Sequence, residues 1–186
     1  MGYSISWIAF KDTAPEEAGR LLALSRTGRL EKVPESMFCG AKLDTGWYLV
    51  VINENGHEFV GEQNLRRVSA TCEILAAGIE EHVMASSAEY WKGGSQMWAV
   101  SHEAESGDAH LAEHGAFPDA YLSIKDRLLA SQKTGEADYV FDIPLKLAES
   151  IVGYKHDEVA KIEFEVLSKA PRPSSGGFFS QLFRKQ

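Results

Sequence analysis

Alternating apolar and polar positions mark most of this chain as short strands. Residues 3–10 alternate and are rich in β-branched and aromatic side chains, which predicts a first strand. The segment 25–34 is polar, so we expect it to be a loop. Further strands are expected over 37–43, 47–52, 71–79, 82–91, 96–103 and 161–167, the last at the surface, with short extended pieces at 110–114 and 139–141.

Helix signals occur at four places. Thr13 and Glu16 have the spacing of a capping box and predict a helix that ends near residue 24. Gly153 predicts the stop of another helix, because glycine adopts the left-handed conformation that ends helices. The expected helices span 13–24, 62–69, 118–133 and 142–152.

Several hairpins combined with a few helices predict an α+β fold. We expect a single domain over 2–168, mainly an antiparallel sheet of roughly six or seven strands with roughly three or four helices packed on one side. Residues 169–186 are expected to be a Pro/Ser/Gly-rich flexible linker followed by a short apolar and basic tail.

The strongest local signal is a Gly-Gly pair, residues 93–94, between two strand-like segments. A two-residue hairpin turn there would place Trp91 opposite Gln96 and Glu89 opposite Trp98. Both tryptophans would then share one face of the hairpin with Glu89 between them. Neither face of the hairpin is purely apolar, so the pattern does not choose the buried side.

Composition indicates a globular chain in a reducing compartment. The 186 residues are 44% hydrophobic, enough for one self-sufficient core. Cys39 and Cys72 have no metal or redox spacing, which argues against a disulfide scaffold. No apolar run has the length of a membrane span, and residues 1–7 lack the basic start of a secretory signal. We therefore expect a cytoplasmic protein without an integral membrane segment.

The negative charge is confined to the middle of the chain. Nine of the 27 acidic residues but one of the 19 lysines and arginines lie between Val68 and Ile124, so this block holds the whole net charge of −8. Such a block repels nucleic acid, whose binders need basic surfaces. It attracts basic protein surfaces or cations, although an acidic face that only maintains solubility is the simpler alternative.

No catalytic motif accompanies this charge. The chain has no phosphate-binding glycine loop and no Gly-x-Ser-x-Gly elbow, and we expect no cofactor. His102, His110 and His114 lie near one another in the sequence, beside acidic residues, and offer a candidate metal site for a small hydrolase. Their spacing fits no known zinc pattern, so solvated loop histidines are the competing interpretation.

The candidate partner-binding residues are the acidic side chains of the hairpin region and the two nearby tryptophans. Tryptophan beside carboxylates is typical of contact surfaces, where one lysine or arginine meets both; core tryptophans are the alternative. The set comprises Glu80, Glu81, Glu89, Trp91, Trp98, Glu103, Glu105 and Asp108.

Together these features predict a non-catalytic protein that binds a basic protein partner. Its size, acidity and lack of catalytic motifs are similar to those of small bacterial immunity proteins, and this likeness implies a toxin as the partner. The alternatives are the small metal-dependent hydrolase and an adaptor recruited through its tail, residues 178–186. The sequence carries no signal for the oligomeric state.

Overall fold

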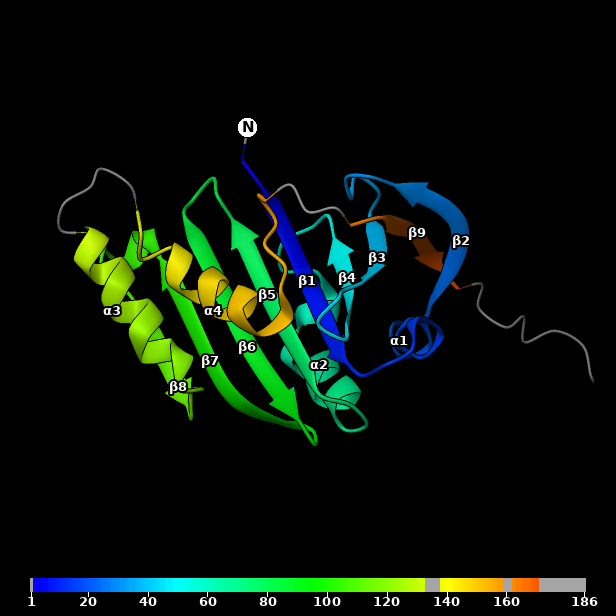
Figure 1. Cartoon of the computed structure of the whole chain (residues 1–186), viewed down its shortest axis with the longest axis horizontal. Coiled ribbons are helices and arrows are strands. Elements are labelled where there is room, and N and C mark those ends of the chain that lie inside the picture. The colour runs from blue at the N-terminus through cyan, green and yellow to red at the C-terminus, as the bar shows by residue number, and fades with distance from the viewer. Residues whose placement is uncertain (1, 133–137, 159–161, 171–186) are drawn as a thin grey trace, which may run out of the picture.

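The computed structural model describes residues 2–132, 138–158 and 162–170. In these ranges an open antiparallel sheet of nine strands is accompanied by four α-helices, with strand order β2-β9-β3-β4-β1-β5-β6-β7-β8 (Figure 1). The α+β class is confirmed, with more strands than the six or seven expected. The strands are β1 (Ser4–Lys11), β2 (Leu24–Glu31), β3 (Phe38–Lys42), β4 (Trp47–Ile52), β5 (Ile74–Glu80), β6 (Ala85–Lys92), β7 (Ser95–Glu103), β8 (Ala112–Gly115) and β9 (Phe164–Lys169). The helices are α1 (Pro15–Leu22), α2 (Glu62–Ser69), α3 (Ala120–Gln132) and α4 (Asp142–Val152), with short 3₁₀ turns η1 (Glu58–Val60) and η2 (Ala104–Ser106).

Helices cover both faces of the sheet, so the expectation of helices on one side was wrong. One apolar cluster joins α3 and α4 to one face, and a second joins α1 and α2 to the other. In Figure 1, α4 crosses in front of the sheet, α3 lies beside α4 at the β7–β8 edge, and α2 lies behind the sheet. Every residue of β4 is buried because the central strands are covered from both sides. Because both faces of β4 are buried, its sequence is apolar at every position instead of alternating.

The predicted loop over 25–34 was wrong for most of its length, because Leu24–Glu31 form β2. This strand lies at the edge of the sheet and pairs only with β9, with an irregularity between Arg26 and Leu30. β9 was expected at the surface, yet it runs between β2 and β3, with Phe164, Val166 and Leu167 buried. An edge strand with exposed polar side chains has no apolar alternation to reveal it.

The Gly93–Gly94 turn is confirmed, but the predicted hairpin register was only partly right. Trp91 lies opposite Gln96 as expected, whereas Tyr90 rather than Glu89 lies opposite Trp98. The register shifts by one residue at Met97, which indicates a β-bulge. Beyond that point every β7 side chain is on the other face from the one the sequence predicted.

Two local details also differ from expectation. The hydroxyl of Thr13 donates to the carbonyl of Lys11 at 2.8 Å and does not cap α1, whose N-cap is Ala14. Residues 139–141 form a turn rather than an extended piece. The stop of α4 at Gly153, with φ of 78°, is confirmed.

The expected domain boundary falls inside a strand. Lys169 pairs with Leu24 in the sheet, one residue past the limit of 168 drawn from the sequence. The linker over 171–177 and the tail over 178–186 lie outside the described residues. No helix in the described part of the chain is both long and apolar enough to cross a membrane.

Candidate functional site

The β6–β7 hairpin buries one face and leaves the other open. Side chains that point toward α3 and α4, such as Ala88 and Val100, are fully buried. Their neighbours on the opposite face, Ser87, Ala99 and Ser101, stay half-exposed. A shallow hollow of about 230 Å³ lies over these small side chains and extends to β8. This part of the sheet therefore has a floor of serine and alanine on which no other element packs in the described part of the chain.

Three of the predicted acidic residues face this open side. The register aligns Glu80 of β5, Ala85 of β6 and Glu103 of β7 in one row, so two carboxylates flank an alanine. A second row aligns Glu89 of β6 and Ala99 of β7 with a β8 residue. We call this surface the open acidic face: Gly78, Glu80, Ala85, Ser87, Glu89, Ala99, Ser101, Glu103, Ala112 and His114.

The remaining predicted acidic residues lie at the end of the sheet next to Glu103. Glu105 in η2 and Asp108 in the following turn are exposed, and neither forms an ion pair within the described ranges. Glu81 accepts a hydrogen bond from the backbone N–H of Tyr3 at 2.8 Å. The backbone N–H of Ala104 donates to the carbonyl of Met84 at 3.2 Å and holds the two turns together. The end of the sheet thus continues the negative surface of the open acidic face.

Trp91 and Trp98 are not surface residues. They are 2% and 4% exposed and belong to different apolar clusters on opposite faces of the sheet. Their predicted position on one face was wrong because the bulge at Met97 turns Trp98 to the other side. Neither ring is available as a contact for a partner, so the acidic residues remain as the candidate binding groups.

Two side chains hold the carboxylate of Glu89 on the open acidic face. The indole N–H of Trp91 and the side-chain amide of Gln96 both donate to Oε2 of Glu89, at 2.8 and 2.7 Å. Burial raises the pKa of Glu89. Glu89 lines a pocket of about 370 Å³ together with Glu62 and Arg66 of α2, Trp91, Gln96 and His114. Sequence reasoning missed Glu62 and Arg66, since only the packing of α2 beside the hairpin brings these two residues to Glu89. Gln96 was placed opposite Trp91 by the predicted turn, but its bond to Glu89 was not anticipated.

The three candidate metal-ligating histidines do not converge. His102 is fully buried on the side of α3 and α4. Its Nδ1 donates to the carbonyl of His110 at 2.7 Å, and its Nε2 lies 3.1 Å from Asp138 Oδ2. His114 lies on the opposite, open face. Within the described residues no group of three or more His, Cys, Asp or Glu side chains is placed to hold a metal ion.

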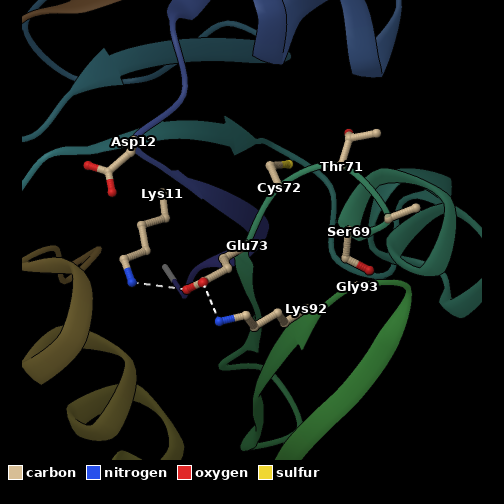
Figure 2. A pocket seen from close by; sticks show the side chains of 9 residues that line it. Lys11, Asp12, Ser69, Thr71, Cys72, Glu73, Lys92 and Gly93 are labelled. Atoms are coloured by element: carbon tan, nitrogen blue, oxygen red, sulfur yellow. Dashed lines mark hydrogen bonds and ion pairs between the residues drawn. The ribbon is translucent and has the colours of Figure 1, made fainter.

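A third hollow, of about 390 Å³, lies at the Lys92 end of β6 and was not anticipated from the sequence. Figure 2 shows Glu73 between Lys11 and Lys92, with ion-pair distances of 3.0 and 2.7 Å. Hydrogen bonds from Lys92, Tyr90 and Lys11 lower the pKa of Glu73 to about 2. A carboxylate with three donors is a poor base and has little remaining capacity for a ligand, so this cluster is a structural ion pair.

Partners within the chain separate the acidic residues into two groups. Glu73 is matched by two lysines, and Glu113 is matched by Lys125 at 2.7 Å. Within the described part of the chain, Glu89 and Glu103 have no cationic partner. On the open acidic face, Glu80 Oε1 lies 2.6 Å from His82 Nδ1, so Glu89 and Glu103 are the carboxylates of this face without an ion pair among the described residues. Comparison of the chain with known protein families, with curated proteins and with solved structures finds no match.

Proposed function

We propose that this chain is a non-catalytic protein-binding protein that presents the open acidic face to a basic protein partner. The proposal rests on one observation: Glu80, Glu89 and Glu103 share one face of the sheet, and within the described residues nothing packs on the small side chains of its floor. A floor of serine and alanine lets a partner approach the sheet closely. Carboxylates around that floor attract a basic surface and orient it before contact.

The charge distribution supports a protein partner rather than a nucleic acid. The middle block of the chain carries the entire net charge of −8, and three of its carboxylates line the open acidic face. A basic toxin is the partner that the likeness to bacterial immunity proteins suggests. We place the protein in the cytoplasm, where a reducing environment suits the free thiols of Cys39 and Cys72.

Charge reversal tests the proposal. Proteins that co-purify with the chain are identified, and the association rate of a basic partner is measured by surface plasmon resonance at about 50 and about 500 mM sodium chloride. Replacing Glu80 and Glu103 with lysine should slow association by about tenfold or more at low salt. High salt should remove most of that difference, because it screens the steering charges.

The matched control reverses two exposed charges elsewhere, Glu54→Lys and Glu163→Lys. This control changes the net charge by the same amount and should leave the association rate within about twofold of the wild type. Circular dichroism establishes that both variants fold. If the partner associates equally fast with the Glu80/Glu103 variant at both salt concentrations, the open acidic face is not its binding surface.

A further inference from the structure

One carboxylate oxygen of Glu89 accepts its full number of hydrogen bonds, and the other accepts none within the described residues. A carboxylate oxygen accepts about two hydrogen bonds, and Oε2 of Glu89 already accepts from Trp91 and Gln96. Within the described residues Oε1 has no hydrogen-bond donor. The two donors also fix the orientation of the carboxylate. Glu89 therefore offers a single, positioned acceptor atom.

The pocket next to Glu89 favours a positive charge. Arg66 is the basic residue that lines it, and Arg66 Nη2 lies 2.7 Å from Glu62 Oε1 on the same helix. That ion pair leaves the charge of Glu89 uncompensated. Glu62 lies close enough to raise the pKa of Glu89 further, after the larger effect of burial. A cation in the pocket would offset the repulsion between these two carboxylates.

The register sets the shape of this pocket. Ala99 lies between Glu89 and His114 in one row across β6, β7 and β8, and it lines the adjoining hollow of about 230 Å³, which Glu89 and His114 also line. The imidazole of His114 lines the far side and, when neutral, can accept a second hydrogen bond. A volume of about 370 Å³ accommodates one extended side chain.

We propose that this pocket binds the primary ammonium group of a lysine side chain of the partner protein, with Oε1 of Glu89 as its acceptor. This inference rests on the proposed function and identifies the group that the open acidic face recognises. Lysine fits better than arginine for a geometric reason. A guanidinium pairs best with a carboxylate through two parallel hydrogen bonds, and Oε2 of Glu89 has no capacity left for the second. A compact ammonium needs one free oxygen only.

Short peptides test this inference without knowledge of the partner. The probes are the blocked tripeptides Gly-Lys-Gly, Gly-Arg-Gly and Gly-acetyllysine-Gly, titrated into the labelled full chain. The indole N–H signal of Trp91 reports binding, because this group donates to Glu89. The lysine peptide should shift that signal, the arginine peptide should bind about threefold or more weakly, and the acetylated peptide should bind about tenfold or more weakly.

A conservative variant separates the charge from the fold. Glu89→Gln keeps a side-chain oxygen for Trp91 and Gln96 and should lower the affinity for the lysine peptide about tenfold or more. Glu54→Gln removes an exposed charge outside both the pocket and the open acidic face and should leave the affinity unchanged. Equal binding of the lysine and acetyllysine peptides by the wild type overturns the inference, and this comparison needs no variant. Arginine binding as tight as lysine also overturns it.

The partner itself distinguishes this inference from the proposed function. If reversal of Glu80 and Glu103 slows association of the partner while Glu89→Gln leaves its dissociation rate unchanged, the lysine pocket is wrong and the open acidic face stands. If the Glu80 and Glu103 reversal has no effect on association, the proposed function fails first. When both substitutions act, with Glu89→Gln mainly on dissociation, both proposals are supported.

Discussion

His102 and Asp138 connect two segments that lie 36 residues apart in the chain, with 3.1 Å between His102 Nε2 and Asp138 Oδ2. Oδ1 of Asp138 accepts hydrogen bonds from the backbone N–H groups of Val140 and Phe141, directly before α4. His102 also bonds to the carbonyl of His110 at 2.7 Å. This pair therefore fixes the end of β7, the turn that follows it and the start of α4 relative to one another.

Removing the aspartate should destabilise the protein. Asp138→Ala leaves a fully buried ring nitrogen without its partner and two backbone N–H groups without their acceptor, so we expect the free energy of unfolding to fall by about 2–4 kcal/mol. Urea denaturation followed by circular dichroism measures the change. Asp126→Ala, at an exposed position of α3, is the control and should change it by about 0.5 kcal/mol or less. Equal losses in the two variants would contradict this role for Asp138.

Trp98 should matter for stability and not for recognition. Its ring stacks on Tyr90 at a centroid distance of 6.0 Å and packs against Phe117 at 5.7 Å. Trp98→Ala should lower the free energy of unfolding by about 3–5 kcal/mol because it leaves a large cavity. Met97→Ala, at the half-exposed bulge residue, should cost about 0.5 kcal/mol or less. A Trp98→Ala protein that retains its stability but loses partner binding would show that this ring is a contact residue.

The hairpin shows how far the local sequence determines this fold. Gly93 and Gly94 both have positive φ, which a two-residue turn requires, so the turn and the Trp91–Gln96 pair were predictable from these two residues. The bulge was not predictable, because it depends on the packing of elements that lie far from the hairpin in the sequence. It places Trp98 in the cluster under α3 and α4 and leaves Trp91 in the cluster under α2. Only the presence of two separate cores makes that arrangement favourable.

The candidate site, like the hairpin, was predictable from the sequence only in part. The one-signed charge of the middle block indicated the acidic residues, and Glu80, Glu89 and Glu103 do share a face. Strand pairing decides which of their neighbours lie with them, and no local pattern encodes it. Arg66, for instance, reaches the Glu89 pocket only because α2 packs beside the hairpin. β2 was missed for a similar reason, since its partner β9 lies about 140 residues later.

Glu73 should make the free energy of unfolding depend on pH in the acidic range. Its hydrogen bonds to Lys92, Tyr90 and Lys11 lower its pKa from 4.5 to about 2 (Figure 2). A carboxylate whose pKa is lower in the folded state stabilises the protein above its unfolded pKa, and this contribution is lost as pH falls toward the folded value. Glu73→Gln should therefore cost on the order of 1 kcal/mol at pH 7, since solvent screens these lysines, and progressively less from about pH 4.5 to about pH 2.

Urea denaturation across this pH range measures the difference between wild type and Glu73→Gln. Glu105→Gln is the matched control, because Glu105 is exposed and forms no ion pair within the described ranges. Its free energy of unfolding should follow that of the wild type at every pH. A constant difference between wild type and Glu73→Gln from pH 7 to pH 2 would exclude the ion pairs as its cause.

Gly115, the last residue of β8, should not tolerate a side chain. It has φ of 85°, and a Cβ atom there would lie 2.1 Å from the carbonyl oxygen of Met97. Gly115→Ala must therefore displace β8 from β7, and we expect a loss of about 2 kcal/mol or more in the free energy of unfolding. Gly28→Ala is the control: its φ of 76° is similar but its surroundings are open, so it should cost about 1 kcal/mol.

Displacement of β8 should also change the Glu89 pocket, because β8 positions His114, which lines that pocket, opposite Ala99. Hydrogen exchange should show faster exchange of the β7 amides that face β8, while the indole N–H of Trp91 keeps its bond to Glu89. Affinity for the lysine tripeptide should then fall about threefold, the loss of one acceptor, and remain above that of Glu89→Gln. If Gly115→Ala costs no more stability than Gly28→Ala and leaves the β7 amides protected, β8 does not form this wall of the pocket.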